Sequence, residues 1–563
     1  MKKLSDWYGG GTPWIWFNAG AVAISIVMVV GLLLLLTVRG MGHFWPRDVM
    51  QAVYAPPSAS EAQSTVIIGE AVETETVSAA QISSSGIPVN ESQPFYERQL
   101  VKLGNRDVTG VDFTWVLRDF VAEVEYPRNV VSLERREWGN FYGYLTAVLA
   151  EGEPVASASV DAPESDAAWE ELSDRLSRAL RIHDEIYDIE RQEIGEINYA
   201  IERLRLQERR LELAGETTPD ALAALDRERA DLDGRYQQLS GQLALLYEQI
   251  NRDSAIFLTA GGREVEIELA DIVRAYRPNA MHLGNKLAIY FSKIGEFLTD
   301  VPREANTEGG IFPAIFGTVV MVMLMSVFVT PFGVIAAVYL REYAQQGAIT
   351  RTIRIAVNNL AGVPSIVYGV FGLGFFIYFI GAEIDETFYQ AALPAPTFGT
   401  PGLLWASLTL ALLTVPVVIV ATEEGLARIP RSVREGSLAL GATKFETLWR
   451  VVLPMASPAM MTGLILAVAR AAGEVAPLML VGVVKLAPTL PLNGNYPYLH
   501  LDQKFMHLGF HIYDVGFQSP NVEAARPLVF ATALLLVIVI GMLNLTAVYI
   551  RNQLREKYKS MDM

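Results

Sequence analysis

Long stretches without a charged residue constrain this chain most, because a helix needs about 20 apolar residues to cross the hydrocarbon core of a bilayer. Four such runs are clear, a fifth begins with polar turns, and a sixth holds two charges. These segments are 14–38, 311–340, 355–381, 401–421, 457–484 and 527–550. The sequence therefore predicts a mainly α-helical, polytopic membrane protein with six transmembrane helices.

Positively charged residues gather on one side of the predicted spans. Lys and Arg precede the first span, lie between the second and third and between the fourth and fifth, and recur in the tail, whereas 383–400 has neither. Cytoplasmic loops carry such an excess, so we predict a membrane protein with both termini in the cytoplasm. The first apolar run is too long for a cleavable signal peptide, which predicts a retained anchor helix over 1–39.

Composition excludes several classes of function. The formal net charge of −17 argues against nucleic acid as a partner, since phosphate backbones are bound by surplus Lys and Arg. The chain has no cysteine, so disulfides and thiolate metal sites are excluded. It also has no phosphate-binding loop of the type that ATPases use, so the chain is not expected to be an ATP-hydrolysing enzyme. We predict no cofactor.

Three histidines, His500, His507 and His511, cluster in the last predicted outer loop. A metal site is conceivable there. No carboxylate stands at a convincing ligand spacing, so we favour interface residues and predict no metal.

Residues 40–305 form a large polar insert between the first two spans, and the predicted orientation places it outside the cytoplasm. The stretch 60–160 mixes short β-like runs with Gly, Pro and Ser, which predicts a small α+β part. The insert is acidic and therefore a poor collector of anions, so it is not expected to be the primary substrate-binding domain. A five-helix core over 306–555 and a cytoplasmic tail over 556–563 complete the predicted domains.

Within the insert, 167–213 and 220–250 are rich in Leu, Glu, Arg and Gln, with apolar residues at three- and four-residue spacing as in coiled coils. A Gly and a Pro separate them, so the simplest prediction is an antiparallel helical hairpin at about 167–250. It could be a docking or gating arm for an outer partner, or a solvated stalk, and the sequence leaves both open.

The loop between the fourth and fifth spans, 422–455, contains EGSLALGATKFETLWRVVLP from Glu435 to Pro454. Its small residues favour a helix–turn–helix with a closely approachable surface, and Gly441 permits the reversal. The segment resembles the loop of ABC importer permeases, whose pattern is Glu-Ala-Ala, three residues, Gly, nine residues, Ile, one residue, Leu-Pro. The spacing is kept, while Gly436-Ser437 replaces Ala-Ala and Val451 replaces Ile.

The resemblance implies the ABC importer permease fold and a coupling loop that docks on an ATP-binding subunit. The residues that carry it are Glu435, Gly436, Ser437, Gly441, Ala442, Leu453 and Pro454.

Three further stretches, which begin at Phe316, Asn359 and Ala469, resemble phosphate permeases of the PstA type. The resemblance covers about residues 311–550, and the insert matches only longer members of that family. It implies a transmembrane subunit of an ATP-driven importer of inorganic phosphate. The implied partners are an ATP-binding subunit, a second permease subunit of the PstC type, an extracytoplasmic phosphate-binding protein, phosphate and membrane lipid.

Two charges interrupt the fifth predicted span. Arg470 and Glu474 are four residues apart, so on one helix they would share a face, and ionisable groups inside a bilayer are usually functional. We predict that both line the translocation path, although a permanently paired bracket between helices is the alternative. Asn359 and Ser365, with Pro364, are predicted to interrupt the third span, either lining the path or packing against other helices.

Two other functions remain open at this point. A permease for another oxyanion, such as sulfate or molybdate, would share the same six-span plan. A membrane-anchored sensor or scaffold would use the hairpin as its working part and would not depend on the coupling loop.

Overall fold

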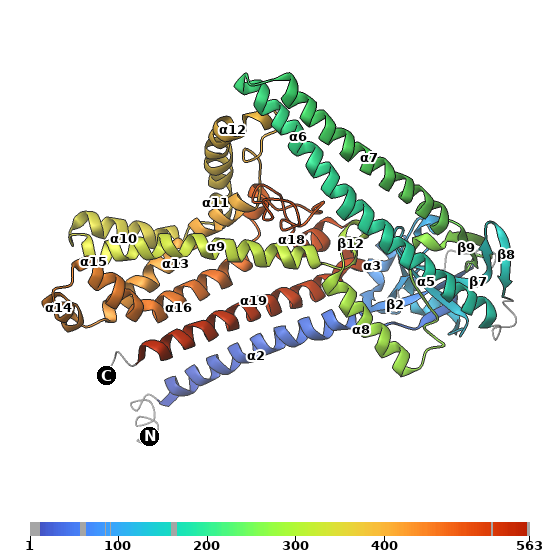
Figure 1. The fold of residues 1–563 in the computed structure, drawn as a ribbon. Helices are drawn as coiled ribbons and strands as arrows, with labels where there is room; N and C mark the ends of the chain where they lie inside the picture. Colours follow the sequence, from blue (N-terminus) through green and yellow to red (C-terminus); the bar gives the residue numbers. More distant parts are fainter. Residues whose placement is uncertain are drawn as a thin grey trace, which may run out of the picture. The chain divides into compact units, whose positions relative to one another are not determined.

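The computed structural model describes residues 12–56, 64–84, 86–90, 92–158, 166–519 and 522–559. It divides into two compact units (Figure 1). We call Met1–His43 with Ile311–Met563 the membrane unit, and Phe44–Gly310 the insert unit. The insert unit is therefore one continuous stretch placed between two parts of the membrane unit.

Among the described residues, six helices are long and apolar enough to cross a membrane, which confirms the predicted class. They begin with α2 (Thr12–Gly42), α9 (Phe312–Val338) and the continuous helix α11–α12 (Ser365–Phe388), and continue with α13 (Leu403–Arg428), α16 (Leu453–Ala472) and α19 (Val522–Lys559). Shorter helices of this unit are α10 (Ala348–Leu360), α17 (Leu478–Val481) and α18 (Leu508–Tyr513). The protein is a multi-pass membrane protein.

Two predicted spans differ in extent from the helices. The helix expected over 355–381 is interrupted between α10 and α11, as predicted, because Pro364 cannot continue a helix that precedes it. The apolar helix then runs beyond the expected end, to Phe388. The helix expected over 457–484 ends at Ala472. Gly473 and Pro477 follow that end and disfavour a continued helix.

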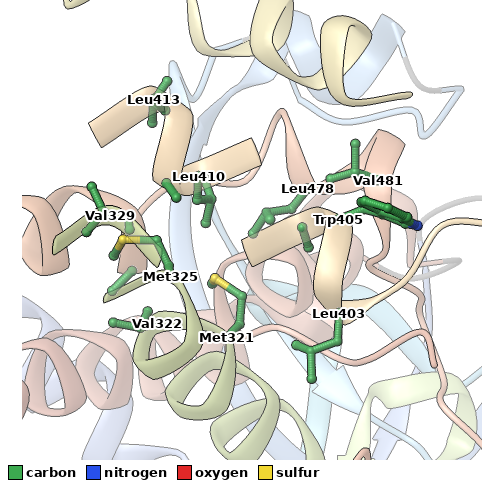
Figure 2. Packing of buried hydrophobic residues seen from close by; sticks show 14 of the residues in the cluster. Met321, Val322, Met325, Val329, Leu403, Trp405, Leu410, Leu413, Leu478 and Val481 are labelled. Atoms are coloured by element: carbon green, nitrogen blue, oxygen red, sulfur yellow. The ribbon is translucent and has the colours of Figure 1, made fainter. Parts of the chain in front are cut away.

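Helix α13 is the centre of the membrane unit and packs between α9 and α16. Small residues allow the close approach: a Cβ added at Gly333 of α9 would lie 2.6 Å from Val418 Cγ1, and one at Gly463 of α16 would lie 2.7 Å from Ala421 Cβ. Figure 2 shows the buried cluster that this packing creates, which includes Met321, Met325, Leu403, Trp405, Leu410, Leu413, Leu478 and Val481.

The described part of the insert unit contains two larger antiparallel sheets and a two-stranded ladder. The first sheet has the order β4-β3-β2-β1-β5, and the second has the order β10-β9-β7-β6-β11, with β8 paired to β7. Their strands are β1 (Val49–Tyr54), β2 (Thr65–Ser78), β3 (Phe95–Lys102), β4 (Phe113–Leu117), β5 (Val121–Glu125), β6 (Val130–Arg135), β7 (Phe141–Ala150), β8 (Glu153–Ser157), β9 (Asp253–Leu258), β10 (Glu264–Glu268) and β11 (Ile272–Tyr276). The ladder joins β12 (Pro302–Arg303) to β13 (Glu308–Gly309).

Two long helical arms extend from the second sheet. The first arm is α5 (Asp166–Asp188), which continues through Ile189–Glu193 into α6 (Ile194–Ala214), and the second is α7 (Pro219–Ile250). Apolar residues of α5 pack on the sheet, and four buried side chains, Ile197, Leu204, Leu225 and Leu232, form the seam between α6 and α7. The two arms form an antiparallel hairpin (Figure 1).

Helix α8 (Leu283–Thr299) follows the last strand of the second sheet. It is the last long element of the insert unit, and only the β12–β13 ladder separates it from the start of α9.

Candidate coupling and translocation site

The candidate coupling loop is built from two short helices between α13 and α16. Helix α14 (Arg431–Ala439) is followed by a turn, then by α15 (Lys444–Thr447), and Leu448–Val452 leads into α16. The predicted residues Glu435, Gly436 and Ser437 lie on α14, and Gly441 and Ala442 lie in the turn. Leu453 and Pro454 begin α16, where proline is favoured because no backbone donor is needed.

Gly441 reverses the chain with φ at +88°, a conformation in which a Cβ is strained. Its N–H donates to Leu438 O at 3.0 Å, and the N–H of Ala442 donates to Ser437 O at 3.3 Å, so the turn closes the end of α14. A Cβ at this position would meet no atom of this chain within 4 Å. The backbone conformation, and not crowding within the chain, therefore requires glycine here.

Side-chain hydrogen bonds then fix the second half of the turn. Thr443 and Glu446 form a reciprocal capping box at the start of α15. The hydroxyls of Ser437 and Thr447 lie 2.9 Å apart, which ties α14 to α15. Hydrogen bonds of backbone and side chains therefore fix the conformation of the turn.

Sequence reasoning missed Arg434, which attaches α14 to the ends of two spans. Its guanidinium donates to Leu426 O and to Glu342 Oε1, both at 2.8 Å, and to Ile429 O at 2.7 Å. The first and last of these acceptors are carbonyls at the end of α13, and Glu342 lies just beyond α9. No local pattern reveals this contact, because Glu342 is 92 positions away in the sequence.

Lys444 makes a second attachment to the same segment. Its ammonium donates to the Glu342 carbonyl oxygen at 2.5 Å and lies 4.3 Å from the ring centroid of Tyr343. Both α14 and α15 are therefore anchored to the chain that follows α9. The helix pair is thus bonded to the ends of both α9 and α13.

The helix pair and the start of the next segment carry several exposed apolar side chains beside exposed charged residues such as Glu435. Leu440 is 90% exposed, and the exposed rings of Phe445 and Trp449 stack with centroids 6.3 Å apart. Leu438 is also exposed beside the small residues Gly436 and Ala439. Exposed apolar patches of this kind mark interaction sites.

Arg470 and Glu474 lie at the other end of α16. Arg470 is in its last turn, while Glu474 follows the helix, so the two do not share the helix face that the sequence predicted. They still form an ion pair, with 3.6 Å between Arg470 Nε and Glu474 Oε1, and both side chains stay partly exposed. This chain by itself therefore does not fully cover the Arg470 side chain.

Asn359 and Ser365 flank the break in the third predicted span. Asn359 is exposed near the end of α10, and Ser365 begins α11. The hydroxyl of Tyr368 donates to Leu360 O at 2.7 Å and so stabilises the break. A Cβ on Gly369 of α11 would lie 2.7 Å from Pro477 Cα, which brings α11 against the segment that follows Glu474.

The coupling residues and the charge pair are not brought together. Leu453 and Arg470 lie at opposite ends of α16, and 17 residues of α-helix extend about 25 Å. A single helix thus connects the two candidate sites.

The three clustered histidines are buried within the chain. His507 Nδ1 accepts a hydrogen bond from the N–H of Gly509 at 3.1 Å and caps α18, while His500 Nε2 lies 2.9 Å from Asn493 Oδ1. His511 is buried within α18. Among the described residues, no group of three or more His, Cys, Asp or Glu side chains could hold a metal.

Comparison with known proteins gives a consistent picture. Residues 329–556 match the family described as "Binding-protein-dependent transport system inner membrane component". The phosphate transport system permease protein PstA 1 of Mycobacterium tuberculosis is 37% identical over 245 residues, which cover 43% of this chain and 71% of that protein. A probable phosphate transport system permease protein PstA of Methanocaldococcus jannaschii is 31% identical over 221 residues, covering 38% of this chain and 67% of that protein.

Among solved structures, the MetNI methionine ABC transporter in an inward-facing conformation matches with 20% identity and a TM-score of 0.31, over 43% of this chain and 94% of that chain. The assignment therefore rests on the sequence relatives. They confirm the predicted family and the prediction that the chain is a membrane transport subunit and not an enzyme. The chain belongs to the binding-protein-dependent inner membrane components of ABC transporters, within the PstA-type permeases.

Proposed function

We propose that this chain is a transmembrane subunit of an ATP-driven importer that moves inorganic phosphate across the inner membrane. The observation that carries the proposal is the identity of 37% to a phosphate transport permease, over 71% of that protein's length. The partners we propose are a separate ATP-binding subunit, a second permease of the PstC type and an extracytoplasmic phosphate-binding protein.

The coupling loop supports an interface with the ATP-binding subunit. Its exposed apolar side chains offer a docking surface, while Arg434 and Lys444 connect it to the segment after α9. Closure of the ATP-binding subunit would then move α14 and α15 and, through α16, the region of Arg470. ATP is cytoplasmic, so the same proposal places both termini in the cytoplasm.

Arg470 is the proposed contact for the anion in transit. A guanidinium binds phosphate through paired charge-assisted hydrogen bonds, and Glu474 neutralises the cation when no substrate is present. Asn359 and Ser365, at the break before α11, are proposed to line the same path, where irregular backbone is tolerated at membrane depth.

The test is uptake by the purified complex in proteoliposomes with ATP inside. Radiolabelled phosphate should accumulate, and excess sulfate or molybdate should compete poorly. A control complex without the ATP-binding subunit should show no accumulation. Efficient competition by sulfate or molybdate would assign the permease to a different oxyanion.

A further inference from the structure

Helix α8 of the insert unit has its charges on the inside and its apolar residues on the outside. Lys293 Nζ lies 2.5 Å from Glu134 Oε1 of β6, and Glu296 Oε2 accepts from Arg274 Nη2 of β11 at 2.8 Å. Lys286 pairs with Asp48. The three charged side chains of this helix are therefore all held against the insert unit.

The opposite face carries an uninterrupted apolar stripe. Leu283 and Phe291 are each 65% exposed, and Leu287 between them is 39% exposed. Leu298, seven residues after Phe291, extends the stripe by two more turns. Residues four or seven positions apart lie on the same face of a helix. A surface helix of a soluble domain has the reverse arrangement, because water favours charges on the outer face.

Residues that directly follow the first span pack on α8. Phe44, two residues after the end of the first span, is buried with its ring centroid 5.0 Å from that of Phe297. Two residues of chain extend about 7 Å at most. At the other side, the chain from Thr299 enters the second span at Phe312.

Aromatic residues reinforce this location. Trp45 and Tyr290 lie with ring centroids 5.7 Å apart, and Tyr290 also contacts Phe291 at 5.4 Å. Trp and Tyr are enriched where proteins meet the headgroup region of a membrane.

We propose that α8 lies in the outer interface of the membrane, with the stripe Leu283, Leu287, Phe291 and Leu298 inserted at the boundary between headgroups and acyl chains. Interfacial helices insert an apolar face in this way. A protein partner would need a groove that fits the apolar stripe. Lipid is the simpler occupant, because α8 packs on residues that directly follow a membrane span. The proposal is independent of the transported substrate.

Site-directed spin labelling tests this directly, because the native chain has no cysteine. Single cysteines are placed at Leu287 and Phe291, and at Leu245 of α7 as a control that is 60% exposed. The full chain, with the subunits that co-purify with it, is reconstituted in phosphatidylethanolamine–phosphatidylglycerol vesicles. Collision rates are measured with oxygen, which partitions into lipid, and with a water-soluble nickel chelate.

At positions 287 and 291 the oxygen-to-nickel ratio should be several-fold higher than at 245. Equal ratios at all three positions would place α8 in water and overturn the proposal. Low accessibility to both reagents at 287 and 291 would show a covering protein and would overturn it as well.

A second measurement needs no substitution. The unaltered complex is irradiated in vesicles that contain a photoactivatable phosphatidylcholine with its reactive group near the top of the acyl chain. Peptides that cover 283–299 should carry the lipid adduct, whereas peptides from α7 should not. Labelling confined to the six spans would contradict the interfacial position.

Discussion

Gly441 occupies a backbone conformation that costs an L-residue roughly 1–2 kcal/mol. We expect Gly441→Asp to abolish uptake while the protein still inserts, because a side chain and a negative charge are added at the docking surface. Gly441→Asn is the matched control, since asparagine tolerates this conformation and adds no charge. Uptake and membrane yield are measured together. Normal uptake by the Asp variant would contradict the coupling role of the loop.

The ion pair at the end of α16 gives the second prediction. Arg470→Gln should keep subunit association and lose phosphate uptake, and Arg470→Lys should retain only part, because an ammonium lacks the planar fork of a guanidinium. Complex yield and radiolabelled uptake are compared for each variant. If the pair is only a bracket, Arg470→Gln lowers assembly, and adding Glu474→Gln restores both assembly and uptake. Recovery of uptake in the double variant would therefore exclude the substrate contact.

Glu134 gives a prediction about pH. Burial by itself raises the pKa of this carboxyl, but Lys293 and Arg274 outweigh burial and lower the pKa to about 2. The ionised form thus stabilises the insert unit above the ordinary pKa of 4.5, and this stability is lost as the pH falls toward 2. The shift corresponds to an order of 3 kcal/mol.

The measurement is the thermal midpoint by circular dichroism of the full chain at pH 5 and pH 3. Other carboxyls also titrate, so the informative quantity is the difference from the Glu134→Gln variant, whose midpoint should fall less between the two pH values. Equal falls in both proteins would show that Glu134 is not the group responsible.

At the scale of elements, the contact between α13 and α16 depends on the absence of side chains. Gly463→Val would push against Ala421 and cost about 1–3 kcal/mol by overpacking. We expect a lower yield of folded complex and reduced uptake. Gly31→Val in α2 is the matched control, since a Cβ there meets no atom of this chain within 4 Å. Similar yields for both variants would contradict close packing of the two helices.

The length and spacing of apolar runs made the long helices predictable, but they did not predict the contacts between distant segments. The six spans follow from their apolar length, and residues now seen in α6 and α7 carried a coiled-coil spacing. The end of α16 at Ala472 was not predicted, because the run of mostly apolar residues continues through Pro477 to Val484. Strand pairing could not be read either: β11 joins β6 across more than a hundred residues.

The same limit applies to the candidate site. Gly441 and its neighbours were found because the coupling pattern is local. Arg434 was not, because its role depends on Glu342 from a distant segment. The exposed apolar face of α8 could not be predicted for a different reason. Its charged residues pair with the insert unit, and the sequence alone suggests that charged residues face outward.

For the whole molecule, the absence of a phosphate-binding loop in the sequence predicts that the purified chain alone does not hydrolyse ATP. Activity should appear when the ATP-binding subunit is added. Phosphate release is measured for the chain, the subunit and the complex, with an inactive ATP-binding subunit as control. ATP hydrolysis by the chain together with the inactive subunit would contradict the prediction that only the separate subunit hydrolyses ATP.

The division of the chain into an anchor helix, an insert, a five-helix core and a tail remains our proposal for its functional domains. The hairpin of α6 and α7 serves either as a docking arm or as a stalk. Complexes that lack the hairpin would distinguish these roles: a docking arm predicts weaker binding of the extracytoplasmic protein, while a stalk predicts unchanged binding and a less stable complex.

The entry and exit of the insert unit meet at one place. Phe44 packs on Phe297 near the end of α8, and the N–H of Gly310 donates to Val301 O, four residues further along. A chain that leaves and returns at neighbouring points can gain or lose the intervening stretch without rerouting the spans on either side. We therefore expect that a chain in which a short loop replaces Phe44–Gly310 would still follow the same path through the membrane.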